Sequence, residues 1–192
     1  MRHLLAPFLL LSAAACSTIS VGAYAAFRGP DALSAEPSSF QIVSSTPQGV
    51  QLDPAGQVLR LSATRSETGQ RVEALFALDR LAIGSSGLKG IKPAEGENLF
   101  LYKIAPDELE RYASLQDQIQ GWRDGSKVNT RQVLAMSVLP AGCIVADTPV
   151  EGRLSTFWLS VDEGDSFMPL AKDIDPTALA LNAQQSEAVH TC

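Results

Sequence analysis

The chain contains very few of the residues from which most active sites are built. Its 192 residues include only two histidines and three cysteines. Because His3 lies at the very start of the chain, a Ser-His-Asp triad would have to use His190, and no G-x-S-x-G elbow accompanies that residue. No set of His, Cys and Asp has the spacing of a zinc site, and no Rossmann or Walker glycine motif is present. We therefore predict a protein that is not an enzyme and that uses no cofactor.

Basic residues are also scarce, since 15 Lys and Arg stand against 21 Asp and Glu, for a net charge of −6. The acidic excess lies from Ile144 onward, where the only basic residues are Arg153 and Lys172. Without a basic stripe to neutralise phosphates, we expect no nucleic-acid partner and no electrostatic docking on anionic lipid. The acidic end is best interpreted as a solubilising surface.

The first part of the chain has the layout of a secretory signal. A positive start, Met1-Arg2-His3, is followed by an apolar run at residues 4–11 and by small residues at 12–15, and no charge occurs between residues 4 and 26. This three-part order is typical of a signal peptide, so we predict that the protein is exported to the periplasmic side of a cell envelope.

Residues 11–16, Leu-Ser-Ala-Ala-Ala-Cys, resemble the lipobox of bacterial lipoproteins, although that family usually has a larger aliphatic residue where Ala13 stands. The resemblance implies that residues 1–15 are a signal peptide, removed just before Cys16, and that Cys16 carries the lipid that anchors the protein to a membrane. Ser17 resembles the residue found in lipoproteins sent to the outer membrane, in contrast to the aspartate that retains them at the inner one.

Two other fates of this segment stay open. Ala23-Tyr24-Ala25 is an A-x-A site, and cleavage after Ala25 would discard Cys16 and release a soluble periplasmic protein. Without any cleavage, the uncharged run is long enough to cross a bilayer of about 30 Å as a single uncleaved anchor.

The remaining chain divides into a linker and one domain. Residues 16–39 are rich in Ala, Gly, Ser and Pro without a sustained period, which predicts a lipid-anchored tether, and residues 40–192 have the size of a single exported domain. Cys143 and Cys192 are the only cysteines of that domain. An even pair in an oxidising compartment predicts a disulfide.

The pattern of apolar residues predicts an α+β domain made mainly of antiparallel β-sheet. Residues 58–64 and 72–78 alternate apolar and polar side chains, and short turns containing glycine separate the early strands, as in a meander with one face on the core. Pro106 is expected to open one amphipathic helix, whose apolar face is formed by Leu109, Tyr112, Leu115, Ile119 and Trp122. The sheet is expected to form a meander, a sandwich or a partly open barrel. The other expected strands are residues 40–43, 50–52, 98–104, 133–139, 143–146, 153–161 and 167–171.

Two loops are candidate contact sites. Residues 84–96 hold a glycine-rich stretch that continues as loop, which argues against a phosphate-binding motif and indicates a mobile surface loop. Asp162, Glu163 and Asp165 are expected at a hairpin turn. They are a candidate calcium site, but the alternating acids and closing glutamate of an EF-hand are missing, so a solvated turn is the preferred interpretation.

These observations predict a non-catalytic cell-envelope protein, a lipoprotein with a scaffolding or accessory role, whose protein partner the sequence does not identify. One alternative is a module that binds a small molecule or lipid in an apolar pocket between helix and sheet. A second alternative is a hydrolase of envelope glycan that uses paired carboxylates, for which two buried acids would have to face one cleft.

Overall fold

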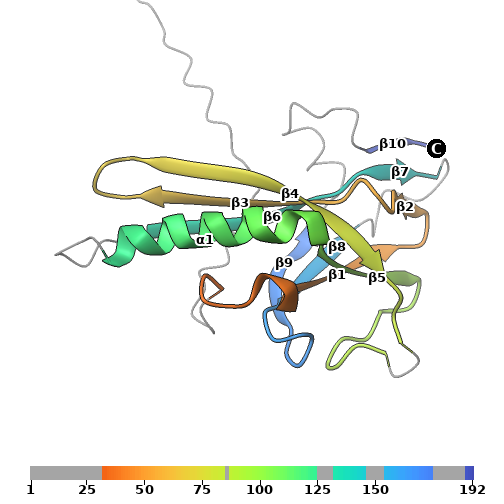
Figure 1. Ribbon diagram of the computed structural model, residues 1–192. Helices are drawn as coiled ribbons and strands as arrows, with labels where there is room; N and C mark the ends of the chain where they lie inside the picture. The colour runs from red at the N-terminus through yellow and green to blue at the C-terminus, as the bar shows by residue number, and fades with distance from the viewer. Residues whose placement is uncertain (1–31, 85–86, 125–131, 146–153, 175–188) are drawn as a thin grey trace, which may run out of the picture.

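The computed structural model describes residues 32–84, 87–124, 132–145, 154–174 and 189–192 of the chain. These residues form an α+β fold, mostly antiparallel β-sheet with one α-helix, as the sequence predicts (Figure 1). The strands are β1 (Gln41–Pro47), β2 (Val50–Leu52), β3 (Val58–Arg65), β4 (Arg71–Leu81), β5 (Glu97–Ile104), β6 (Gln132–Leu139), β7 (Gly142–Ile144), β8 (Ser155–Ser160), β9 (Met168–Ile174) and β10 (Val189–Thr191). The helices are α1 (Leu109–Asp124) and two 3-10 turns, η1 (Pro37–Ser39) and η2 (Pro106–Glu108).

Seven strands form the main sheet, in the order β6-β3-β4-β5-β1-β8-β9, with every neighbouring pair antiparallel. This sheet curves into a nearly closed, partly open barrel. Among the early strands predicted to form a meander, only β3 and β4 are neighbours, and β5 follows β4 in the sheet. The first strand does not pair with the second, because β1 lies between β5 and β8. Strand β2 pairs instead with β7 in a smaller sheet of order β10-β7-β2.

Side-chain alternation along the strands separates two hydrophobic clusters. Ile42 of β1 and Tyr102 of β5 are register partners and face the main core, whereas the next pair, Val43 and Leu101, faces the opposite side of the sheet. The alternating residues of β3, of which Leu59 and Leu61 are fully buried, also face the main core. Because successive residues of a strand point to opposite faces, the β1–β5 pair is covered on both sides.

Helix α1 packs its predicted apolar face against the main core. Tyr112 and Ile119 are fully buried there, and Leu115 and Trp122 are buried as well. Pro106 begins the 3-10 turn η2 that precedes the helix, a position that tolerates a residue without an N–H. A membrane-spanning helix would have to be longer and more apolar than any helix that the described ranges contain.

The packed domain begins earlier than the predicted boundary at residue 40. Ala32 and Leu33 are buried in the main core, and the side-chain amide of Gln116 in α1 donates to the carbonyl oxygen of Ala32 at 3.0 Å. The hydroxyl of Ser39 donates to the carbonyl oxygen of Val161 at 2.8 Å. Residues 32–39 therefore belong to the domain and not to the tether, while residues 1–31, including the predicted signal and Cys16, lie outside the described residues.

The smaller sheet continues the β3–β6 ladder past a short break. The buried side chain of Gln57 spans the break, with its amide donating to the carbonyl oxygens of Asp53 at 2.9 Å and Ala141 at 2.7 Å. Beyond it, β7 runs so close to β2 that a Cβ at Gly142 would lie 2.2 Å from the carbonyl oxygen of Gln51. Only a residue without a side chain fits there.

The C-terminal end of the chain forms a strand that is absent from the strands expected from the sequence. Residues Val189–Thr191 form β10, which pairs in parallel with β7, so that His190 lies in register with Cys143.

Candidate functional site

The loop predicted as a mobile contact segment, residues 84–96, is fastened to the sheet in its described part. Ile91 is buried in the second hydrophobic cluster with Val43 and Leu101, and Leu88 packs against this cluster. Leu88 and Ile91 also form an isolated antiparallel bridge. The apolar side chains of the loop therefore hold it down, while Lys89 and residues 92–96 are exposed.

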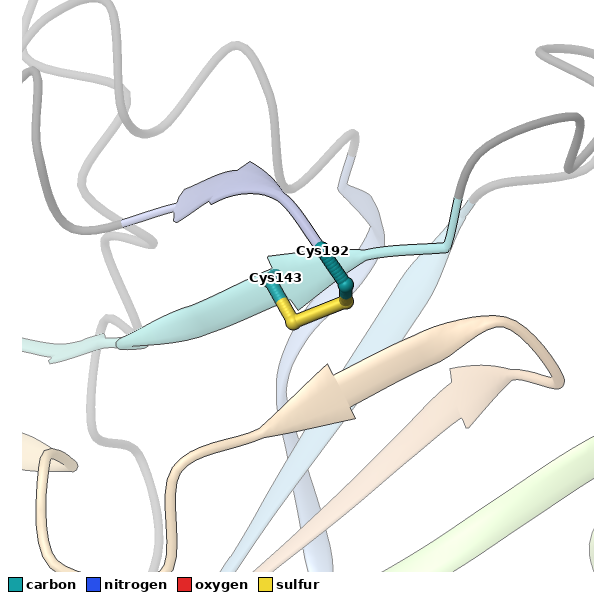
Figure 2. The surroundings of a disulfide bond; sticks show 2 residues. All are labelled: Cys143 and Cys192. Carbon is teal, nitrogen blue, oxygen red and sulfur yellow. A yellow bond between two sulfur atoms is a disulfide. The ribbon is translucent and has the colours of Figure 1, made fainter.

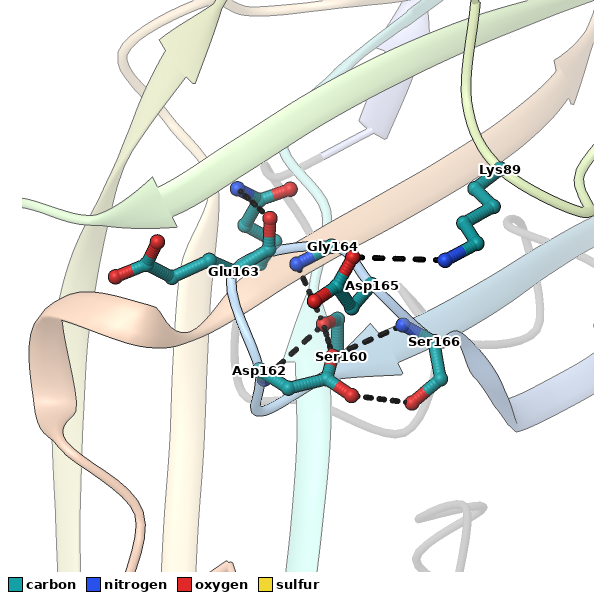
Figure 3. A network of polar contacts seen from close by, with 8 residues as sticks. Lys89, Ser160, Asp162, Glu163, Gly164, Asp165 and Ser166 are labelled. Atoms are coloured by element: carbon teal, nitrogen blue, oxygen red, sulfur yellow. Dashed lines mark hydrogen bonds and ion pairs between the residues drawn. The ribbon is translucent and has the colours of Figure 1, made fainter.

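The acidic turn between β8 and β9 is built around the hydroxyl of Ser160. This hydroxyl donates to Asp162 Oδ1 at 2.6 Å and accepts a hydrogen bond from the backbone N–H of Gly164 at 2.9 Å (Figure 3). The backbone N–H and hydroxyl of Ser166 both donate to the Asp162 carboxylate. Glu163 adopts a left-handed conformation with φ 59°, which Glu rarely takes outside a turn.

These contacts determine the charge state of Asp162. Hydrogen bonds from the Ser160 hydroxyl, and then from the hydroxyl and N–H of Ser166, lower the pKa of Asp162 to about 2. Hydrogen bonding to the charged form of a carboxylate favours that form. Asp162 is therefore ionised throughout the neutral and mildly acidic range, and its oxygens already have donors within the turn.

The turn does not arrange its three acids around one point. The main-chain carbonyl of Glu163 accepts a hydrogen bond from the side-chain amide of Gln41 at 3.1 Å, and the carboxylate of Asp165 faces Lys89 (Figure 3). Within the described residues, no three His, Cys, Asp or Glu side chains are placed to hold one metal ion. Asp162, Glu163 and Asp165 thus share a turn but do not converge as calcium ligands.

Replacing Ser160 by alanine is expected to raise the pKa of Asp162 from about 2 towards 3.8, because the largest stabilising hydrogen bond is lost. Since the native pKa is the lower one, Asp162 stabilises the fold fully above pH 3.8, and this contribution disappears as the pH falls through about 2. Carboxyl carbon chemical shifts measured by NMR during a pH titration would check this. Ser114→Ala, at an exposed position on α1, is the control. A wild-type Asp162 that titrates near 3.8 would contradict the prediction.

The two predicted contact segments meet in space. Lys89 Nζ of the loop lies 3.5 Å from Asp165 Oδ1 of the turn, although 76 residues separate them in the chain (Figure 3). Phe167, just after the turn, packs on the same hydrophobic cluster as Leu88 and Ile91. We call residues 87–96 and 162–166 together the loop–turn surface.

The predicted disulfide is present between Cys143 and Cys192. Their sulfur atoms are bonded at 2.02 Å and their Cα atoms lie 5.2 Å apart (Figure 2). Cys143 lies in β7 and Cys192 directly follows β10, whose backbone continues the parallel pairing as Cys192 N–H donates to the carbonyl oxygen of Ile144 at 3.0 Å. The disulfide therefore fastens the C-terminal strand to the smaller sheet.

The sequence did not indicate a pocket that lies at the end of β4. The pocket has a volume of about 540 Å³, and Arg80 is the one charged residue among its otherwise apolar lining residues. Its lining residues are Pro54, Arg80, Leu81, Ala82, Ile83, Leu99 and Phe100. An arginine in a strand is unremarkable in a sequence, so only the spatial neighbours of Arg80 reveal the pocket.

The acids whose side-chain burial the structure describes are partly or fully exposed. The buried polar side chains there are Ser, Thr and Gln, and no Asp or Glu is among them. Glu108 has a lowered pKa because Arg111 Nε donates a hydrogen bond to its carboxylate at 2.6 Å, and the two residues form an ion pair at the start of the helix. No pair of buried carboxylates faces a cleft in this part of the chain.

Comparison with known proteins returned no relative, since no protein-family model matches the chain and no curated protein or solved structure is significantly similar to it.

Proposed function

We propose that this protein is a non-catalytic lipoprotein of the cell envelope that binds a partner protein through the loop–turn surface, in a scaffolding or accessory role. The observation that carries the proposal is the contact between the two segments. Residues 87–96 and 162–166 are far apart in sequence, yet the Lys89–Asp165 ion pair and a shared hydrophobic cluster join them into one surface.

The loop–turn surface is held in place before any partner arrives. Ile91 is buried beneath it, and the Ser160 and Asp162 hydrogen bonds lock the turn. Ordering a loop on binding costs free energy, so a surface that is already ordered binds more tightly for the same contacts. Exposed charges of both signs, on Lys89, Lys92, Glu95 and Asp165, supply the electrostatic pattern that selects a partner.

Export and anchoring rest on the first residues of the chain. The charged start, the apolar run and the lipobox-like residues 11–16 support cleavage before Cys16 and lipidation of its thiol. Under this proposal, an outer-membrane anchor follows from Ser17. Residues 16–31 then connect the lipid to a domain whose packing begins at or before Ala32.

The packing favours this proposal over the two alternatives. A ligand between helix and sheet would need space where the fully buried side chains of Tyr112, Ile119 and Leu61 are packed in one cluster. A glycan hydrolase that uses two carboxylates would need buried acids, and the described residues contain none.

The proposal is tested by placing a photo-crosslinking amino acid at Lys92 or Asp165 in cells with an intact envelope. We expect a discrete adduct with one protein from both positions, because both lie on the loop–turn surface. A crosslinker at Asp117, exposed on α1, is the matched control and should give no such adduct. Equal adducts from all three positions, or none from the surface, would refute partner binding there.

Mass spectrometry of the same purified protein decides the anchor. A diacylglyceryl-Cys16 terminus supports the lipoprotein proposal. An Ala26 terminus would make the protein soluble and periplasmic, and an intact Met1 would mean an uncleaved anchor.

A further inference from the structure

The segment that enters the domain contacts both helix α1 and the acidic turn. We call residues 32–41 the strap. The side-chain amides of Gln116 and Gln120 in α1 donate hydrogen bonds to three carbonyl oxygens of the strap, those of Ala32, Leu33 and Ala35. Gln116 is itself buried, and its Nε2 lies 3.0 and 3.1 Å from the oxygens of Ala32 and Ala35. One end of the strap is therefore fastened to the helix by hydrogen bonds as well as by the burial of Ala32 and Leu33.

The other end of the strap is bonded to the acidic turn. The hydroxyl of Ser39 donates to the carbonyl oxygen of Val161 at 2.8 Å, and the backbone N–H of Glu163 donates to the carbonyl oxygen of Ser39 at 3.1 Å. The side-chain amide of Gln41 donates to the carbonyl oxygen of Glu163, also at 3.1 Å. Gln41 lies so close to Gly164 that a Cβ at this glycine would be 2.7 Å from Gln41 Oε1. The strap and the turn therefore pack directly against each other.

Within the turn, the strap holds the one non-glycine residue that has a left-handed backbone. Glu163 has φ 59°, and such a conformation persists only where surrounding contacts compensate for its cost. Both backbone groups of Glu163 make hydrogen bonds with the strap, the N–H with Ser39 and the carbonyl oxygen with Gln41. The hydrogen bonds of Ser160 and Asp162 stabilise the turn from within. The backbone of Glu163, in contrast, is held in place by the strap.

The middle of the strap is short and hydrogen-bonded. The N–H and the hydroxyl of Ser39 both donate to the carbonyl oxygen of Glu36, at 2.9 and 2.7 Å, across the 3-10 turn η1. Phe40 is fully buried, with its ring centroid 5.1 Å from that of Tyr112 in α1. Because only three residues separate Ala35 from Ser39, we expect a displacement of the first strap residues from α1 to move Ser39 as well.

We propose that the strap couples its docking on α1 to the shape of the acidic turn, so that docking and partner binding at the loop–turn surface stabilise each other. This inference rests on the function proposed above and adds a means of regulating it. Two equilibria linked in this way affect each other by the same factor, typically about 5–150-fold. Residues 16–31, which connect the domain to the proposed lipid anchor, directly precede the strap. A pull on the anchor that detaches the strap from α1 therefore weakens partner binding.

The coupling is tested first without a partner, in the Gln116→Ala/Gln120→Ala double variant of the full chain. Hydrogen exchange measured by NMR reports how often each amide opens. We expect the amides of Glu163 and Gly164 to exchange at least about fivefold faster than in the wild type, because the strap no longer docks firmly on α1. Unchanged exchange at both amides would overturn the proposal.

Gln118→Ala is the matched control, since Gln118 is exposed on the same helix, and it should leave exchange in the turn unchanged. The amide of Leu61, in the main sheet, should exchange at the wild-type rate in all variants, which separates local detachment from general unfolding.

The reverse direction uses Ser39→Ala, which removes the hydroxyl contact with Val161 and leaves α1 untouched. If the strap is a coupled unit, the side-chain amide signals of Gln116 should shift towards those of a glutamine without hydrogen bonds. Gln116 signals that stay in place while the turn loosens would show that the two ends of the strap are independent, and the proposal would be wrong.

A photo-crosslinker at Asp165 then measures partner binding in the double variant and in otherwise wild-type protein. We expect the adduct yield to fall at least about fivefold when Gln116 and Gln120 are replaced, and to stay unchanged with Gln118→Ala. No adduct in otherwise wild-type protein would refute the proposed function itself. A normal adduct yield in the double variant would overturn only the coupling, so the two failures are distinguishable.

Discussion

Replacing both Cys143 and Cys192 by serine is expected to lower the free energy of unfolding by about 4 kcal/mol. The two cysteines are 49 residues apart, and the loop they close contains both β8 and β9. In the chain-entropy account, the crosslink restricts the unfolded chain over this whole loop, so that less conformational entropy is lost on folding. The bond also retains β10, a parallel strand of only three residues that few backbone hydrogen bonds hold.

Urea denaturation followed by tryptophan fluorescence would measure this loss in the Cys143→Ser/Cys192→Ser double variant. Wild-type protein unfolded under reducing conditions should lose a similar amount. Ser114→Ala is the control, because Ser114 is exposed on α1 and lies outside the loop that the disulfide closes, and it should leave the free energy of unfolding nearly unchanged. A loss below about 1 kcal/mol in the double variant would show that the disulfide constrains the unfolded chain little.

Replacing Tyr112 by alanine is expected to cost about 3–5 kcal/mol, as for other large side chains removed from a core. Its ring is fully buried and makes edge-on contacts with Phe40 and Phe76, at centroid distances of 5.1 and 4.9 Å. These contacts join α1 both to β4 and to the residue that precedes β1. Truncation leaves a cavity that the surrounding strands cannot fill without moving.

The matched control is Tyr112→Phe, which keeps the ring and removes the hydroxyl. That hydroxyl is buried and has no hydrogen-bond partner among the described residues, so its removal is expected to be neutral or to stabilise the protein by about 1 kcal/mol. Thermal and urea unfolding of both variants would check the pair of predictions. If Phe destabilised the protein as much as Ala, the hydroxyl and not the ring would be the stabilising group, and the packing argument would be wrong.

Local sequence patterns predicted the elements well. The alternation of Leu59, Leu61 and Ala63 marks β3, and the spacing of Tyr112, Ile119 and Trp122 marks the buried face of α1. These patterns report which face of an element is buried, and that depends on residues close together in the chain. The cysteine count was sufficient for the disulfide, because only one pair was available in the domain.

Strand partners were less predictable. The position of β1 between β5 and β8, the pairing of β2 with β7 and the parallel β10 join residues that are many positions apart. An alternating strand carries the same pattern whichever neighbour it has, so hydrophobic periodicity does not determine the order of strands. The tether boundary was placed too late for a similar reason, since the burial of Ala32 and Leu33 depends on a helix more than seventy residues further along.

For the candidate sites too, the sequence predicted the local segments but not which segments come together in space. Local sequence predicted an acidic turn at Asp162 and a glycine-containing loop near Lys89, and the export signal in the first residues stays a prediction. Only the tertiary structure decided that the turn and the loop meet, that Ser160 and Ser166 donate to the Asp162 carboxylate, and that the Arg80 guanidinium lies over the Phe100 ring. The sequence determines which side chains are available. A binding surface also depends on the distances between side chains on different strands, and strand pairing sets these distances.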